Sequence, residues 1–395
     1  MEVEWMPLPE LLKKETTDFS LTIGLPAEQN QHENRIVLTP SEVNMLVEMG
    51  YKVIVERNLG GELFSDHQFA EAGAMLTSSH GEAFFADIVI RVSPPDLEEI
   101  TLLKPQSTLI TSIVGVAKNE KHLHSLLNGK ITAIAFEYIQ NATDNFSLYG
   151  ALQELSGYTA VITAASLFSD NVEGQGRTLC GWAGIPPAKV LILGSNAIAT
   201  TAAATAAQLG AQVKVIGQSL SELDKTLKTV KTPISTEILR WETLPKTLSE
   251  ADIVISAFQF IDVASPLFIP TEMIANMRPN SVIMDLSINC GGCFETSRPT
   301  TPTHPTFQKE GVTHYCLTDI TVSVSQTASL IISYFIFEAL QKIKFEGGTD
   351  NFLILNTAWL NGVYTYKGYI TNLNINKLHN LPFKEINLLM AIFNK

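Results

Sequence analysis

A short apolar run that enters a glycine turn and then an alanine-rich segment constrains the fold of this chain more than any other feature. The run is Lys189–Leu193, the turn is Gly194–Ala199, and the alanine-rich segment continues to Gly210. A second apolar run, Gln212–Ile216, follows directly. This order predicts a strand, a tight turn, a helix and a second parallel strand, which is the layout of a Rossmann βαβ unit. The helix N-terminus of such a unit faces the phosphates of a bound nucleotide.

The glycine turn keeps part of the fingerprint of a dinucleotide site. Gly194 stands in the place of the first glycine, and Ala199 stands in the third place, where close packing of helix on strand matters. Asn196 replaces the middle glycine, and Ser195 lies between Gly194 and Asn196. We expect the side chain of Asn196 where the backbone of a glycine would approach the phosphates. The turn therefore predicts a nucleotide site in altered form.

The end of the second strand departs further from the fingerprint. An acid is expected there for the hydroxyls of a ribose, and this chain has Gly217. Glu222 and Asp224 lie beyond it and would have to reach back from the next turn. Because no acid stands at the strand end and Lys225 is near, rejection of a 2′-phosphate is not expected. NAD, NADP and a doubly wound domain without a nucleotide are the three alternatives.

Short apolar runs alternate with helix-length segments along the rest of the chain. This alternation predicts an α/β protein with two doubly wound, Rossmann-like domains that flank a cleft. We expect residues 1–150 with 326–395 in a substrate domain and residues 151–325 in a nucleotide-binding domain. The further expected strands are Leu21–Leu25, Lys52–Glu56, Ile88–Val92, Thr108–Thr111, Ile131–Phe136, Asp252–Ser256 and Ser281–Leu286. The expected helices are Pro40–Met49 with Thr39 as its N-cap, Leu152–Phe168 between the domains, and Ala328–Phe345 and Phe383–Phe393 in a C-terminal part that we expect to be helical.

Composition and charge exclude several classes of protein. The chain has 395 residues with 27 Lys and Arg against 40 Asp and Glu, and its formal charge of −13 disfavours binding to nucleic acid. Apolar runs such as Thr327–Phe337 are shorter than the roughly 20 residues of a bilayer span. The N-terminus lacks the pattern of a signal peptide. We therefore expect a soluble, cytoplasmic protein without membrane or nucleic-acid partners.

Four cysteines in so long a chain predict no disulfide framework. Cys290 and Cys293 form a C-x-x-C motif, but the sequence around them has no second pair and no clustered histidine. A turn is the preferred interpretation over a zinc or redox site, and we expect no metal.

Several blocks in a fixed order resemble the alanine dehydrogenases and the related soluble alpha subunit of NAD(P) transhydrogenases. The blocks are Pro26–Glu28, Glu33–Pro40, Ala86–Val89, Thr132–Glu137, Gly184–Val190, Gly291–Thr301, His314–Cys316 and Asn361–Gly368. The resemblance implies a homo-oligomer, an amino-acid or small-carboxylate substrate, and NAD or NADP as cofactor. It also implies that Gly194, Ser195, Asn196, Ala199, Gly217, Asp285, Leu317 and Ile320 lie at the nucleotide.

The catalytic residues of the family are only partly present. Oxidative deamination needs a cation for the substrate carboxylate and groups that move protons. By the resemblance, Arg35 matches the carboxylate-binding arginine, whereas Ser93 replaces the catalytic lysine and Asn289 replaces the catalytic aspartate. Arg91 lies two residues before Ser93 and could supply the charge of the lysine but not its proton exchange.

The general acid/base histidine of the family falls on or near Val114. His122 and His124 lie downstream of it, on a helix that we expect at the surface. No titratable side chain is therefore expected in the place of the family's histidine.

Two functions from different classes follow. The first is an NAD(P)-dependent oxidoreductase of alanine dehydrogenase type that converts L-alanine to pyruvate and ammonia, or carries out a related hydride transfer. The second is a pseudoenzyme, an eroded relative that binds a small carboxylate, a nucleotide or a protein partner without turnover. Since loss of one general acid/base costs about 10²–10⁴-fold in rate, three such losses favour the second function.

Some of these residues also have structural interpretations. Arg35 could pair with Glu28 or Glu33 to hold a surface turn, and Asp285 could cap the turn that follows it. Glu137 is either a buried, paired carboxylate or a residue of the cleft. His314–Cys316 is expected to pack rather than react.

Overall fold

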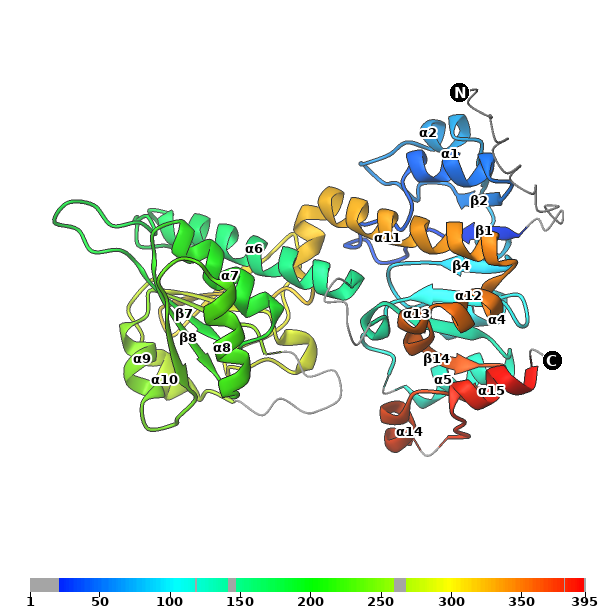
Figure 1. Cartoon of the computed structure of the whole chain (residues 1–395). Coiled ribbons are helices and arrows are strands. Elements are labelled where there is room, and N and C mark those ends of the chain that lie inside the picture. The colour runs from blue at the N-terminus through cyan, green and yellow to red at the C-terminus, as the bar shows by residue number, and fades with distance from the viewer. Residues whose placement is uncertain (1–20, 118, 141–146, 259–267, 380, 394–395) are drawn as a thin grey trace, which may run out of the picture.

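The computed structural model describes residues 21–117, 119–140, 147–258, 268–379 and 381–393. The chain forms two α/β lobes, each built on its own sheet (Figure 1). The predicted fold class, α/β with two such domains, is confirmed. The first lobe is defined here by an eight-stranded sheet, and the second lobe by a seven-stranded sheet.

The sheet of the first lobe has the order β15-β14-β6-β5-β4-β1-β2-β3. Strands β1 to β6 are parallel, and β14 adds to β6 in the antiparallel direction. The strands are β1 Thr22–Leu25, β2 Lys52–Glu56, β3 Met75–Thr77, β4 Ile88–Ile90, β5 Thr108–Thr111, β6 Thr132–Ala135, β14 Val363–Tyr366 and β15 Tyr369–Ile370. The expectation that the C-terminal part is helical was therefore wrong for β14 and β15. Both strands form one hairpin, with Lys367 at positive φ in its turn.

Helices from both ends of the chain cover this sheet. They are α1 Pro40–Glu48, α2 Asp66–Glu71, α3 His80–Phe84, α4 Leu97–Leu102, α5 Glu120–Asn128, α11 Ser325–Glu346, α12 Thr349–Leu355, α13 Thr357–Gly362, α14 Leu373–His379 and α15 Ile386–Phe393. A 3-10 turn, η1 Phe136–Tyr138, follows β6. The expected surface position of α5 was wrong for His122, which is 1% exposed, whereas His124 is exposed and pairs with Glu120.

Helix α11 ties the C-terminal part to the first lobe. Ser329 Oγ accepts a hydrogen bond from Ile36 N at 3.0 Å, and Ser333 Oγ accepts one from Thr39 N at 2.9 Å. Thr39 occupies the N-cap position of α1, but its hydroxyl donates to Glu42 instead of capping the helix. Within the part of the chain that the structure describes, one helix, Ile320–Glu346, is long and apolar enough to cross a membrane by length and composition. Its buried residues Ile332, Ile336 and Ile343 pack into the core of the first lobe, whereas Ile320 at its start lies in the core of the second lobe.

The sheet of the second lobe has the order β12-β13-β11-β10-β7-β8-β9, and all its strands except β12 are parallel. The strands are β7 Lys189–Leu193, β8 Gln212–Gly217, β9 Ser235–Ile238, β10 Ile253–Ser256, β11 Val282–Asp285, β12 Thr306–Lys309 and β13 Val312–Tyr315. The helices are α6 Leu148–Ser169, α7 Ala197–Gln208, α8 Leu220–Thr229, α9 Leu244–Glu250 and α10 Thr271–Ala275, with 3-10 turns η2 Ile288–Cys290 and η3 Ile320–Val324. Strand order reverses at β7, because β8 lies on one side and β10 on the other. Open α/β sheets bind ligands at such a switch point.

Candidate functional site

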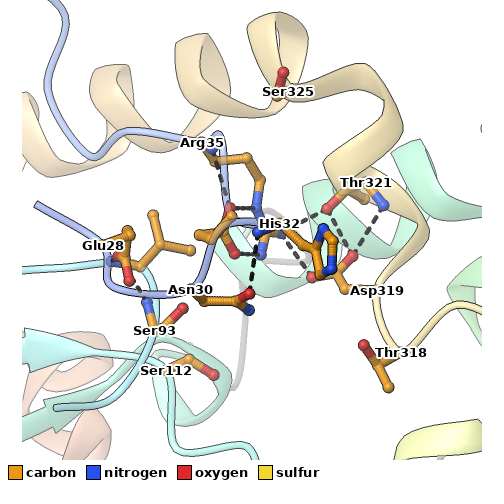
Figure 2. A network of polar contacts seen from close by, with 12 residues as sticks. Glu28, Asn30, His32, Arg35, Ser93, Ser112, Thr318, Asp319, Thr321 and Ser325 are labelled. Carbon is orange, nitrogen blue, oxygen red and sulfur yellow. Dashed lines mark hydrogen bonds and ion pairs between the residues drawn. The ribbon is translucent and has the colours of Figure 1, made fainter. Parts of the chain in front are cut away.

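Arg35 lies in the segment between β1 and α1 and has no free nitrogen in its guanidinium (Figure 2). Nε donates to Glu33 Oε1 at 2.7 Å, and Nη2 donates to Glu33 Oε2 at 2.6 Å. Nη1 donates to Asp319 Oδ2 and to Thr321 Oγ1, each at 2.6 Å. The side chain is 7% exposed. Burial alone lowers the pKa of Arg35, but the nearby carboxylates of Asp319 and Glu33 outweigh it and raise that pKa.

The partners of Arg35 come from two different places in the chain. Glu33 is two residues away, as one of the structural interpretations expected. Asp319 follows β13 of the second lobe and caps η3 by accepting from Thr321 N at 2.9 Å and Thr321 Oγ1 at 2.7 Å. The ion pair between Arg35 and Asp319 therefore joins the two lobes. No local signal in the sequence identifies Asp319, because it is 284 positions from Arg35.

Glu28 pairs with Arg91 and not with Arg35. Glu28 accepts from Arg91 Nε at 3.0 Å and from the backbone of Val92 and Ser93 at 2.9 and 3.1 Å. Arg91 Nη1 lies 2.6 Å from Glu99, and the Arg91 side chain is 4% exposed. Burial raises the pKa of Glu28, and Arg91 partly opposes this rise. Two buried carboxylates, Glu28 and Glu99, already pair with Arg91, and its role as a substitute for the charge of the family's lysine stays a prediction.

His80 and Glu56 continue the network of ion pairs that Arg91 forms with Glu28 and Glu99. Glu99 accepts from His80 Nε2 at 2.9 Å, and His80 Nδ1 lies 2.7 Å from Glu56. Glu56 in turn accepts from Ala27 N at 2.8 Å. These contacts fix the segment that carries Glu28 against the ends of β2 and β4.

No side chain that exchanges protons stands at Ser93, Val114 or Asn289. Ser93 meets Glu28 through its backbone N–H. Val114 is 41% exposed, and its N–H donates to Ser112 Oγ at 3.2 Å. Asn289 lies in η2 and donates to the carbonyl of Thr318, next to Asp319. Figure 2 shows Ser93 and Ser112, which follow β4 and β5 in the chain, on one side and Thr318 with Asp319 on the other.

Glu137 is a buried acid beside this region. It follows β6, accepts from the Ser112 hydroxyl and accepts from Ile113 N at 3.0 Å. Burial raises the pKa of Glu137, although the hydrogen bonds from Ser112 and Ile113 oppose the rise. Ser112, which the sequence did not single out, connects this carboxyl group to the side of the site drawn in Figure 2.

The glycine turn of the second lobe has the local geometry of a Rossmann turn. Gly194 has φ +120°, and Ala199 is fully buried against the sheet. Asn196 is the N-cap of α7: its Oδ1 accepts from Ala199 N at 3.0 Å, and its Nδ2 donates to Ala257 O at 2.6 Å. The amide of Asn196 thus fills the first turn of the helix that a phosphate would approach. The backbone at Gly194 and the small side chain of Ala199 fit a bound nucleotide. The side chain of Asn196 takes up part of the space that the phosphates would enter.

Gly217 ends β8, and an ideal Cβ there would lie 2.9 Å from Leu223 Cδ2 and 3.0 Å from Ser195 Oγ. Ser195 Oγ donates to Glu222 Oε2 at 2.5 Å. The carboxylate of Glu222 therefore lies beside the glycine turn, at the carboxyl end of the sheet.

The interior of the second lobe contains three further residues that the resemblance placed at the nucleotide, Asp285, Leu317 and Ile320. Asp285 is fully buried and accepts from Ser287 N at 3.0 Å, Cys293 N at 2.9 Å and Ser297 Oγ at 2.6 Å, so it caps the turn that follows it. Leu317 and Ile320 are buried in the core. Among the described residues, no group of three or more His, Cys, Asp or Glu side chains has the arrangement of a metal site.

The fold and the site define a class: a two-domain α/β protein with a dinucleotide-type turn at the switch point of its second sheet. Family models place the chain within that class. The model described as "Alanine dehydrogenase/PNT, N-terminal domain" matches residues 24–158, and "Alanine dehydrogenase/PNT, C-terminal domain" matches residues 160–373. The chain belongs to the alanine dehydrogenase/PNT family.

Individual proteins agree with this assignment. Alanine dehydrogenase from Halomonas elongata is 34% identical over 315 residues, which cover 78% of this chain and 84% of that protein. Alanine dehydrogenase from Staphylococcus epidermidis is 30% identical over 368 residues, covering 93% and 99%. The solved structure of an L-alanine dehydrogenase has a TM-score of 0.81 at 28% identity and covers 91% of this chain and 99% of that one. A transhydrogenase from Sinorhizobium meliloti shares the fold, with a TM-score of 0.73 at 21% identity, covering 89% and 99%.

Proposed function

We propose that this chain binds a nicotinamide nucleotide, NAD or NADP, in its second lobe and has lost the amino-acid deamination chemistry of its family. The observation that carries the loss is the guanidinium of Arg35, whose three nitrogens all donate to Glu33, Asp319 or Thr321. A substrate carboxylate would need that cation. Asp319 already presents a carboxylate to it.

The proton chemistry supports the same proposal. Deamination needs a group that accepts and returns protons at the reacting nitrogen and carbon. Ser93, Val114 and Asn289 offer none, and Arg91 is neutralised by Glu28 and Glu99. A nicotinamide would supply the hydride acceptor, but Ser93, Val114 and Asn289 would move no proton, and the paired Arg35 would hold a substrate carboxylate poorly.

The experiment is equilibrium binding of NADH and NADPH by nucleotide fluorescence, with alanine-dependent NAD or NADP reduction measured on the same preparation. We expect binding of at least one nucleotide and no alanine-dependent reduction. Binding of neither nucleotide would contradict the first half of the proposal. Alanine turnover with the pH profile of a titrating base would contradict the second half.

Asn196→Asp is the matched variant for the binding half. Aspartate caps a helix about as well as asparagine, but it loses the hydrogen bond that Asn196 Nδ2 donates to Ala257 O, so the melting temperature of the variant is measured beside its affinity. Its charge would repel phosphates at the helix N-terminus. We expect nucleotide affinity to fall by about tenfold or more at an unchanged circular dichroism spectrum.

A second function is favoured by the contact between Ser112 and Glu137. Because burial raises the pKa of Glu137, this carboxyl group can hold a proton above the usual range of an acid. Glu137 could replace the family's histidine as proton donor in a hydride transfer to a small 2-oxo acid. The Ser112 hydroxyl would then lie between the Glu137 carboxyl group and the substrate. Glu137→Gln would abolish such an activity while leaving nucleotide binding unchanged.

The remaining features of the proposal concern organisation. We propose residues 1–150 with 326–395 as the substrate-side domain and residues 151–325 as the nucleotide-side domain. We take a cavity of about 490 Å³ at the surface as support for a homo-oligomer. Helices α6, α7 and α11 line this cavity, and its aromatic residues are Tyr158, Tyr334 and Phe335. Tyr158 and Tyr334 are exposed there. We also propose a cytoplasmic location, an amino-acid-derived carboxylate as the small ligand if one binds, and no nucleic-acid or membrane partner.

A further inference from the structure

The end of β8 carries no acid for an adenosine ribose, and the side chains of Leu223 and Ser195 lie close to the space that such an acid would enter. An ideal Cβ on Gly217 would stand 2.9 Å from Leu223 Cδ2 and 3.0 Å from Ser195 Oγ. Contacts under 3.0 Å require one of the neighbours to shift. Gly217 therefore belongs to a local arrangement in which Leu223 and Ser195 take the space above the strand end.

Glu222 brings a carboxylate to the place that Gly217 leaves without one. Helix α8 begins after Ser219, whose side chain caps it by accepting from Glu222 N, so Glu222 lies in its first turn. From there Oε2 accepts from Ser195 Oγ at 2.5 Å. Ser195 follows Gly194 directly, and its hydroxyl lies between the Gly217 position and this carboxylate. Oε1 of Glu222 makes no hydrogen bond to any residue that the structure describes.

We infer that Glu222 is the residue that accepts hydrogen bonds from the adenosine ribose hydroxyls of a bound dinucleotide and selects NADH over NADPH. The inference rests on the proposed nucleotide binding and adds its specificity. A ribose diol offers two donors, and a carboxylate held by a serine hydroxyl offers acceptors in a fixed position. A 2′-phosphate in the same place would meet the negative charge of Glu222.

The other charged residues of α8 do not fill this role. Asp224 pairs with Lys228 at 2.5 Å, one turn along the helix. Lys225 is exposed and belongs to the same helix. It is the nearest cation in sequence for a 2′-phosphate, so removal of the Glu222 charge leaves a helix end that accepts NADPH more readily.

The test is a fluorescence titration of the full chain with NADH and with NADPH, for the parent, Glu222→Gln and Ser195→Ala. We expect the parent to prefer NADH by about tenfold or more. Glu222→Gln should weaken NADH binding by about tenfold and leave NADPH binding within twofold of the parent or strengthen it. Ser195→Ala should lower the preference by a smaller factor, because Glu222 stays but loses its fixed position.

Asp224→Asn is the matched control, because it removes a charge of the same sign from the same helix. It should leave the ratio of the two affinities unchanged. Equal parental affinities, or a ratio that Glu222→Gln changes by less than twofold, would overturn the assignment of Glu222 while nucleotide binding stands. A parent that binds neither nucleotide would overturn both the assignment and the proposed nucleotide site, and the two failures are therefore distinguishable.

Discussion

Arg35 and Asp319, 284 positions apart in the chain, form an ion pair of 2.6 Å that joins the two lobes. Glu33 holds the other edge of the same guanidinium through two hydrogen bonds. One cation thus faces two carboxylates. A third carboxylate, from a substrate, would have to displace Asp319 and enter a cluster that is already negative in sum.

Removal of the Asp319 carboxylate should therefore open Arg35 to small carboxylates. We predict that Asp319→Ala increases the affinity for pyruvate by about ten- to a hundredfold, since a hydrogen bond to a charged group contributes roughly 1.5–3 kcal/mol. Isothermal titration calorimetry of the parent and the variant measures the change. The gain should vanish in Asp319→Ala/Arg35→Ala.

Asp66→Ala is the control for a general effect of removing an ion pair. Asp66 pairs with Arg57 at 3.4 Å on the surface of the first lobe. This variant should bind pyruvate as the parent does. If Asp319→Ala bound pyruvate no better than Asp66→Ala, the proposal that Asp319 and a ligand carboxylate compete for Arg35 would be wrong.

The parent should show no alanine-dependent reduction of NAD or NADP at about pH 9, where release of protons favours deamination. Ser93→Lys, Val114→His and Asn289→Asp together return the three proton-exchanging residues of the family. We predict that activity appears only when Asp319→Ala is added to these three changes, because Arg35 must also be free. Activity of the triple variant with Asp319 intact would show that the ion pair opens readily.

The sequence alone allowed us to predict those strands and helices whose apolar residues follow a clear local pattern. Lys189–Leu193 became β7 residue for residue, because a buried parallel strand is a continuous apolar run with a glycine at its end. The hairpin of β14 and β15 was missed although its two-residue turn contains Gly368 at positive φ, since β14 also pairs with β6, more than 200 residues away in the chain. His122 was misplaced because one face of α5 is buried under contacts that the short helix alone does not reveal.

The sequence allowed a prediction of which residues belong to the candidate site, but not of the ion pairs that they form. The turn at Gly194 follows from residue order, and the replacements at Ser93, Val114 and Asn289 follow from the resemblance to the family. The neutralisation of Arg35 and Arg91 does not, because it depends on carboxylates supplied by Asp319 and Glu99 from other elements. Long-range ion pairs leave no period in a sequence, so their partners emerge only from the fold.

Asn196→Gly should improve nucleotide binding by removing the amide that narrows the turn. We predict a severalfold gain for both NADH and NADPH in fluorescence titrations. A small loss of stability should accompany it, because glycine replaces an asparagine N-cap at a cost of only a few tenths of a kcal/mol. Gly217→Asp should not help, since its Cβ meets Leu223 and Ser195. A gain in Gly217→Asp alone would mean that these side chains move freely.

Buried His122 should make the first lobe sensitive to acid. Burial lowers the pKa of His122 to about 4 from its usual 6.5, although Asp96 opposes the shift, so the neutral form is the folded form. A lowered folded-state pKa gives stability that is present above pH 6.5 and is lost as the pH falls towards 4. Between neutral pH and about pH 5 this histidine should account for roughly 2 kcal/mol of lost stability. Urea unfolding should show that His122→Leu loses correspondingly less over the same interval, whereas His124→Leu, an exposed position on the same helix, behaves as the parent does. Equal acid sensitivity of the parent and His122→Leu would mean that another group causes the loss.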